Sequence, residues 1–230
     1  MPYYGLDWTY SFVLIGAVIA AIASSRVSTT YAKFGKVGSH SGLTAMQAAR
    51  SILDNAGLRQ VRIERIAGDL TDHYSPKELV LRLSDTTINS NSIAAIGVAA
   101  HECGHAIQHA KKYVPLTVRN SIVPVVNIGS KLSWPMILIG MFFGVAGFLD
   151  LGIVFFSFSL FFQLITLPVE FDASSRALRI LRETNMLYED ELKGAKKVLS
   201  AAAMTYVAAA IASLLSLLRL IILFGGRRRD

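Results

Sequence analysis

Long apolar segments, separated by shorter polar ones, dominate the chain. The three longest are residues 6–25, which carry no charge from Ser11 onward, Leu132–Pro168, whose only charged residue is Asp150, and Met204–Phe224. A helix rises 1.5 Å per residue and needs about 20 apolar residues to cross a bilayer. The first and last segments therefore each predict one transmembrane helix. The middle segment is too long for one span and predicts two shorter helices that turn near Asp150.

The polar segments between these spans predict a small folded part. Thr44-Ala-Met-Gln is a capping box that begins a helix, and Gly57 ends it. Residues 61–66 and 79–83 alternate between apolar and charged positions, a pattern typical of half-buried strands, and the two could pair across the turn region between them. The sequence therefore predicts a mainly α-helical integral membrane protein. It has about four transmembrane helices, with a small β-hairpin or sheet in the membrane-proximal part.

Composition and charge support this class. Apolar residues make up 53% of the chain and charged residues only 17%, which is typical of a membrane protein. The net charge is +7, but no basic run is interleaved with aromatic residues, so no nucleic-acid partner is expected. Residues 26–131 and 169–203 hold 19 of the 23 Lys and Arg residues, which favours a cytoplasmic location for both segments. Four full spans would then place Arg227–Arg229 outside, so either the last segment does not cross fully or the tail is an exception.

The polar residues with the clearest chemistry are His101, Glu102 and His105, which form a His-Glu-x-x-His motif. Ser92 can cap the start of a helix that contains it, and on that helix His101 and His105 lie on one face, one turn apart. Two imidazoles at that spacing can share a zinc ion, and Glu102 can then accept a proton from zinc-bound water. The alternative is two ordinary histidines near a glutamate on an amphipathic helix.

Zinc in a hydrolytic site usually has a third protein ligand. His109 lies about 12 Å from His101 along a continuous helix, too far for one ion to bind both histidines and His105. Glu170 is the better candidate, because the membrane hairpin returns it to the side of His101, and it would open a polar helix after Pro168. The alternative role for Glu170 is a favourable interaction with the helix dipole.

Asp150 is a rival ligand. Leu149-Asp150-Leu151-Gly152 nearly matches the Leu-Asp-Gly motif of intramembrane site-2 proteases, although a simple turn also explains the aspartate. His73 and Arg176 are candidate donors to the transition state. An exposed edge strand beside the motif helix could bind an extended peptide, or the small sheet could merely cover the helix. Cys103 lies on nearly the opposite helix face from the histidines and is expected in the core.

Four stretches carry a resemblance to a known family: Leu70–Tyr74, Ser92–His109, Phe162–Leu178 and Gly194–Val207. The chain resembles the bacterial YugP-like membrane zinc metallopeptidases. This resemblance implies a zinc-dependent peptidase in the bacterial plasma membrane, with His101 and His105 as zinc ligands and Glu102 as catalytic base.

The layout is more distantly similar to the HtpX-type gluzincins, which take a third ligand from a glutamate on a later helix. Glu170 matches that position. Their pattern has an aspartate four residues after the glutamate, where this chain has Ser174, and the nearby acid is Asp172.

The predicted function is therefore a membrane-anchored, zinc-dependent endopeptidase that uses Glu102 as general base on peptide or membrane-protein substrates at the cytoplasmic face of the lipid bilayer. The alternatives are a zinc-stabilised scaffold without catalysis, and an intramembrane protease that uses Asp150. In this interpretation the chain divides into an N-terminal anchor (1–25), a zincin-like region with the motif helix (26–131), a transmembrane hairpin (132–168), a helical segment with the third zinc ligand (169–203), and a C-terminal transmembrane helix with a basic tail (204–230).

Overall fold

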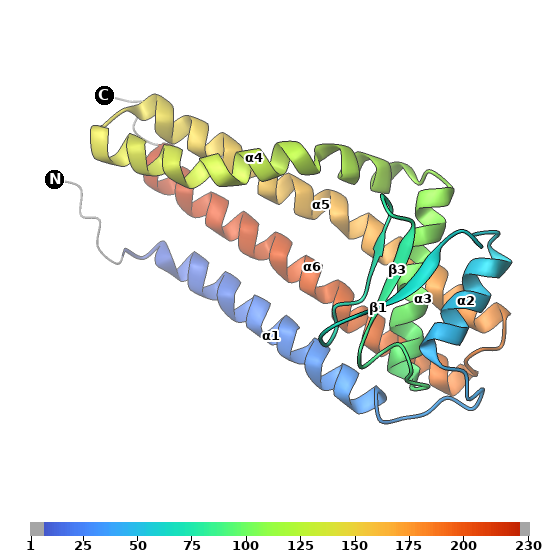
Figure 1. Ribbon diagram of the computed structural model, residues 1–230. Helices are drawn as coiled ribbons and strands as arrows, with labels where there is room; N and C mark the ends of the chain where they lie inside the picture. Colours follow the sequence, from blue (N-terminus) through green and yellow to red (C-terminus); the bar gives the residue numbers. More distant parts are fainter. Residues whose placement is uncertain (1–6, 226–230) are drawn as a thin grey trace. The chain divides into compact units, whose positions relative to one another are not determined.

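The structure is a computed structural model that describes residues 7–225. Leu6, at the start of the first predicted span, and the Arg227–Arg229 tail lie outside the described residues. The described elements, in chain order, are α1 (Tyr10–Phe34), α2 (Ala45–Asn55), β1 (Arg62–Ile66), β2 (His73–Ser75), β3 (Val80–Ser84), α3 (Ile93–Ala110), α4 (Val114–Phe143), α5 (Ala146–Glu183) and α6 (Glu189–Phe224) (Figure 1).

Four of these helices, α1, α4, α5 and α6, are long and apolar enough to cross a membrane. In the most apolar 18-residue stretch of each of these helices, only 11% to 17% is buried inside the protein. Most of the apolar surface of these helices is therefore left to face lipid. The predicted class, a mainly helical membrane protein with four spans and a small sheet, is confirmed. Residues group into two compact units, and each of the four long helices contributes residues to both.

Unit 1 contains the described residues up to Ala23, Val118–Leu167, and those from Thr205 onward. Within it α4 and α5 form a hairpin, and the Ser133 hydroxyl on α4 donates a hydrogen bond to the Gly152 carbonyl on α5 at 2.9 Å. The turn lies at Gly144 and the residue after it, not near Asp150 as predicted. Gly144 adopts a φ of +69°, a left-handed conformation that glycine reaches without strain and that ends α4 there.

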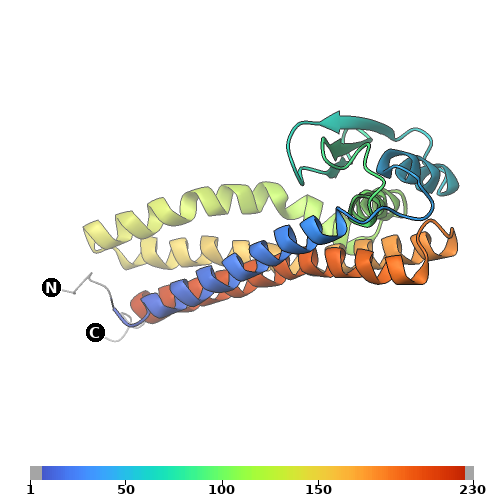
Figure 2. The same cartoon turned by 90° about the horizontal axis from the view of Figure 1, so that it is seen from below.

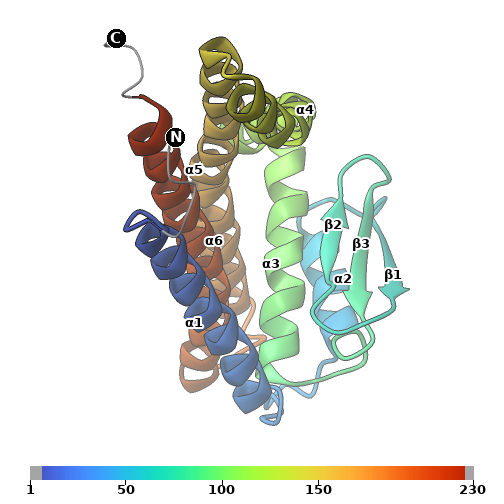
Figure 3. The same ribbon diagram turned by 90° about the vertical axis from the view of Figure 1, so that its left-hand side faces the viewer.

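Unit 2 contains Ser24–Thr117 and Pro168–Met204, and its sheet has the order β1-β3-β2 (Figure 3). The two predicted strands do pair, but in parallel, so the hairpin expected between them is wrong. The missed strand is β2, which pairs antiparallel with β3 and lies on the side of the sheet nearest α3. A strand of three residues has too few positions to show an alternating pattern, and the true hairpin joins β2 to β3.

The motif helix α3 lies at the centre of unit 2, between the sheet and α2 on one side and α5 and α6 on the other (Figure 2). The predicted caps are confirmed: Thr44 and Gln47 form the capping box of α2, and Ser92 caps α3. Gly57 adopts a φ of +76° just past the end of α2. Alanines and glycines fill much of the α3 surface, so that several elements can pack against it closely.

A predicted helix start at Glu170 is wrong, because α5 continues through Pro168 to Glu183. Proline removes only one backbone hydrogen bond, and helices that cross membranes tolerate this loss. Glu170 is therefore an interior residue of a long helix and is 3% exposed. The helix dipole, which acts within the first turn, does not explain a buried carboxylate at this position.

Gly104, within the motif, sets the distance between α3 and α5. A Cβ atom at this position would lie 2.7 Å from the carbonyl oxygen of Ala173. The two backbones therefore approach more closely than any residue with a side chain permits. Ala173 lies within one turn of Glu170, so this contact also brings Glu170 towards α3.

We expect Gly104→Ala to destabilise the protein by about 1–3 kcal/mol, because the added methyl group forces α3 and α5 apart. Gly97→Ala is a matched control on the same helix, where the new Cβ would make an ordinary contact at 3.4 Å with the Cβ of Ala195. The control should keep or raise stability by up to about 1 kcal/mol, through the better helix propensity of alanine. Thermal unfolding of both variants in detergent measures the difference, and equal midpoints would contradict the close-approach argument.

Candidate metal centre

Three side chains from α3 and α5 converge in unit 2. The Oε2 atom of Glu170 lies 3.3 Å from Nε2 of His101 and 3.6 Å from Nε2 of His105. One candidate ligand atom each from His101, Glu102 and His105 also lies within 4.8 Å of the others. Two imidazoles and one carboxylate are the protein donor set of a catalytic zinc site with an open fourth position.

The second nitrogen of each imidazole is held by a hydrogen bond. Nδ1 of His101 bonds with the Ser174 hydroxyl at 3.1 Å, and Nδ1 of His105 bonds with Oε1 of Gln108 at 3.0 Å. Since an amide oxygen only accepts, Nδ1 of His105 carries a proton, and in the neutral imidazole the Nε2 lone pair is therefore directed to the cluster. Metal-binding histidines in proteins are oriented by hydrogen bonds of this kind.

Gln108 connects the two helices that build the cluster. It is fully buried, and its Nε2 donates to the carbonyl of Val169 at 2.8 Å and to Oδ2 of Asp172 at 2.7 Å. Arg176 donates in turn to both oxygens of Asp172 and lies 5.6 Å from the ring centroid of Tyr113. The hydrogen bonds from His105 therefore run through Gln108 to the same stretch of α5 that carries Glu170.

Glu102 is placed between the sheet and the two histidines. Its Oε2 accepts the backbone N–H of Tyr74 on β2 at 3.0 Å. Burial raises the pKa of the Glu102 carboxyl, although the neighbouring His105 and His101 oppose this shift. The side chains of His101 and His105 are 15% and 13% exposed, so solvent reaches the cluster that Glu102 adjoins.

The charge balance of the cluster favours a cation. Burial lowers the pKa of His105, but the hydrogen bond that its protonated form donates to Glu170 and the charges of Glu102 and Glu170 outweigh burial, so the net shift is upward. Two carboxylates here lie near two imidazoles, which are neutral when they bind a metal ion. The donor set and its charge both fit a divalent metal ion such as zinc.

The other predicted residues do not join the cluster. His109 has its Nδ1 3.0 Å from the Tyr74 hydroxyl, His73 bonds through Nδ1 to the carbonyl of Thr71, and Arg176 binds Asp172. Asp150 lies near the start of α5, in unit 1. The prediction that Cys103 belongs to the core is confirmed, because it is fully buried and its thiol contacts the Ala49 carbonyl at 3.6 Å.

The sequence analysis missed two residues that shape the cluster. Gln108 follows His105 by one helical turn on the same face, a spacing that could have indicated the hydrogen bond. Tyr74 contributes a backbone N–H, and no property of its side chain indicates that role. Ser174 occupies the position of the expected aspartate and takes over the hydrogen bond to His101, while Asp172 acts on Gln108 instead.

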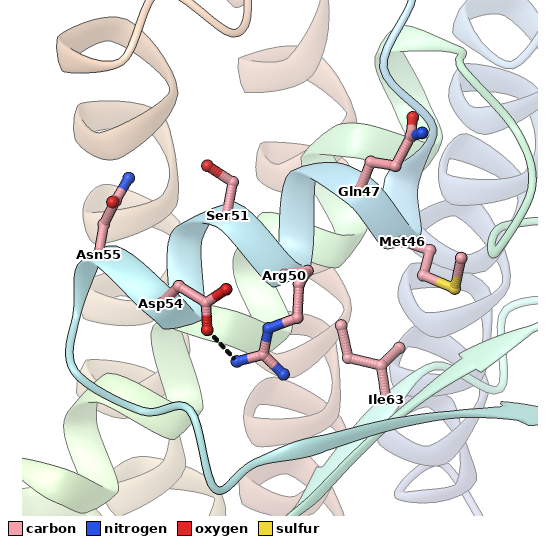
Figure 4. A pocket seen from close by; sticks show the side chains of 7 residues that line it. All are labelled: Met46, Gln47, Arg50, Ser51, Asp54, Asn55 and Ile63. Atoms are coloured by element: carbon pink, nitrogen blue, oxygen red, sulfur yellow. Dashed lines mark ion pairs between the residues drawn. The ribbon is translucent and has the colours of Figure 1, made fainter.

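A separate hollow of about 730 Å³ lies between α2 and β1 (Figure 4). Asp54 is the only carboxylate among its lining residues, and it forms an ion pair with Arg50 at 2.8 Å. Arg50 also donates to the carbonyls of Val61 and Leu58, so this ion pair joins α2 to the segment before β1. No histidine lines this hollow, and it offers no comparable set of metal ligands.

The imidazoles of a His-Glu-x-x-His helix face a carboxylate from a later helix, and four helices of the chain are able to span a bilayer. Together these features define a class of membrane metallohydrolases. The chain belongs to the family described as "Putative neutral zinc metallopeptidase", which matches residues 9–225. It is similar to the "Putative membrane protease YugP" of Bacillus subtilis (strain 168), with 46% identity over 216 residues that cover 94% of this chain and 96% of the relative. No solved structure matches the chain.

These comparisons confirm the resemblance to the YugP-like family, the membrane location and zinc as the expected cofactor. They also confirm the broad class, a membrane protein of a zinc metallopeptidase family. The more distant similarity to the HtpX-type gluzincins stays a prediction.

We expect Gln108→Leu to weaken zinc binding about 10–100-fold, because His105 loses the acceptor that orients its ring. Cys103→Ala is the control, since it removes a buried side chain from the opposite face of the same helix and should lower stability without changing zinc affinity. Competition with a chelator of known affinity, on detergent-purified protein, measures both. Equal zinc affinity in wild type and Gln108→Leu would show that the amide has no part in positioning His105.

Proposed function

We propose that this protein is a zinc-dependent endopeptidase of the gluzincin type, with His101, His105 and Glu170 as zinc ligands. The observation that carries the proposal is the approach of one Glu170 oxygen to Nε2 of both histidines, at 3.3 and 3.6 Å. Zinc bound by this set supplies a Lewis acid that polarises the scissile carbonyl and makes a water molecule more acidic.

Glu102 is the proposed general base. Its carboxylate takes a proton from the attacking water as the oxygen forms a bond to the carbonyl carbon. It then gives that proton to the amine nitrogen as the C–N bond breaks, which regenerates the carboxylate. The Tyr74 N–H bond fixes one oxygen of Glu102, and the raised pKa brings the group closer to the pH at which it must both accept and donate.

The strand β2 supports a mode of substrate binding. It forms one edge of the sheet and packs against α3, and its residue Tyr74 already contacts Glu102. An extended peptide that pairs with this edge would run beside the cluster. We therefore propose that the substrate is an extended segment of a protein chain.

The location of the cluster along the chain supports membrane-proximal substrates. Within the continuous helix α5, the part that belongs to unit 1 ends at Leu167, and Glu170 lies three residues further along. Most Lys and Arg residues lie in the same segments as the cluster, which supports the cytoplasmic side. In this proposal residues 26–131 and 169–203 form the catalytic part, and residues 1–25, 132–168 and 204–230 anchor it.

Glu102→Gln should retain zinc and lower the rate of casein cleavage by about 10²–10⁴-fold, because the amide cannot accept the proton of the attacking water. Glu64→Gln is the matched control, on the exposed face of β1 in ion pairs with Arg62 and Arg82. It should cleave casein like wild type. If Glu102→Gln cleaves at the wild-type rate, Glu102 is not the base, and a zinc-stabilised scaffold becomes the better description.

Glu170→Ala should lose most of the zinc that wild type retains after purification, because only two ligands remain. Glu183→Ala, at the end of the same helix, should keep the wild-type zinc content. Elemental analysis of detergent-purified protein, with zinc expressed per chain, tests both variants side by side. Full zinc in Glu170→Ala would remove this residue from the ligand set.

A further inference from the structure

Four lysines gather where the end of α1 meets the start of α6, on the part of both helices that belongs to unit 2. They line a hollow of about 590 Å³ together with two hydroxyl side chains. The polar lining residues are Thr30, Lys33, Lys193, Lys196, Lys197 and Ser200. This hollow shares no lining residue with the metal cluster.

Three acids precede these lysines in the first turn of α6; of these, Glu189 pairs with Arg182 and Glu191 with His40. Among residues 7–225, no ion pair joins any of the four to a carboxylate, and the contact described for Lys33 is with the ring of Phe34 at 5.7 Å. Lys193 and Lys197 are four residues apart on α6, and like charges at that spacing repel each other. An anion that occupies the hollow would reduce this repulsion.

The hollow lies beside the uncharged stretches of both helices, which is where lipid is the nearest source of an anion. On α6, Lys197 is followed by an uncharged stretch from Val198 to Leu218. On α1, an uncharged stretch ends at Ser25, and Lys33 follows about 12 Å further along the helix. Side chains of a helix lean towards its N-terminus, so the long Lys33 side chain leans back towards the apolar part of α1. On α6 the same lean tilts the lysine side chains away from the uncharged stretch, so Lys197, which directly precedes that stretch, is the α6 lysine nearest to the level of the lipid phosphates.

We propose that this lysine-lined hollow binds the phosphate head group of an anionic phospholipid. The ammonium groups supply the positive charge, and the hydroxyls of Thr30 and Ser200 can donate hydrogen bonds to phosphate oxygens. Basic pockets at the ends of transmembrane helices recognise lipid head groups by this chemistry. The proposal concerns lysines outside the metal cluster and does not depend on the peptidase activity.

The test is native mass spectrometry of the full chain in detergent, titrated with phosphatidylglycerol and, separately, with phosphatidylcholine of the same chain length. The variant is Lys193→Gln/Lys197→Gln. The control is Lys111→Gln/Lys112→Gln, which removes the same charge just before another span, at α4. Inorganic phosphate is added in a further arm, and the thermal midpoint of each variant is measured to establish that it is folded.

Wild type and the control should bind phosphatidylglycerol more tightly than phosphatidylcholine. Lys193→Gln/Lys197→Gln should bind phosphatidylglycerol about tenfold more weakly, with an unchanged thermal midpoint. Equal weakening in the control would overturn the proposal, because it would show a general attraction to positive charge. Equal binding of the two lipids by wild type would also overturn it. Displacement of phosphatidylglycerol by inorganic phosphate at similar concentration would overturn the lipid as the source of the anion.

Discussion

The rest of unit 2 depends on one buried carboxylate that faces two imidazoles. A charged carboxylate inside a protein is strongly unfavourable unless cations or hydrogen bonds compensate it. On α5 itself, the Arg176 guanidinium binds the nearby Asp172, whereas Glu170 faces the imidazoles of α3. Its Oε2 is directed to His101 and His105 on α3, so the two helices must stay in contact for Glu170 to remain buried.

The small residues of α3 make this contact possible. Gly104 lies between the two histidines and lets the backbone of α5 approach at Ala173, while Gln108 joins the helices by hydrogen bonds one turn further along. Gly97 and Gly104 lower the helix propensity of α3 but allow neighbouring helices to approach it closely. Steric fit and hydrogen bonding act on the same pair of helices, so a change in either alters the position of Glu170 relative to the histidines.

The sequence predicted what depends on local spacing. The histidine pair, the caps at Thr44 and Ser92, and the long apolar helices each follow from short-range rules that hold without tertiary contacts. The parallel pairing of β1 with β3 and the continuation of α5 through Pro168 were not predictable in this way. The direction of a strand is set by the path of the chain between strands. A proline at the edge of an apolar segment is equally compatible with the start of a helix and with a helix that continues through it.

The convergence of Glu170 with the histidines could be inferred from the topology of the chain and from the similarity to gluzincins, but not from local spacing. The predicted hairpin returned Glu170 to the correct side, although its turn was placed too late. The prediction tolerates this error because the side to which a hairpin returns does not depend on the residue at which it turns. Exact hydrogen bonds between the helices do depend on it: whether Ser174 or Asp172 meets the second nitrogen of His101 is decided by a small rotation of α5. A hydropathy pattern does not contain that information, and the side-chain contacts between α3 and α5 do.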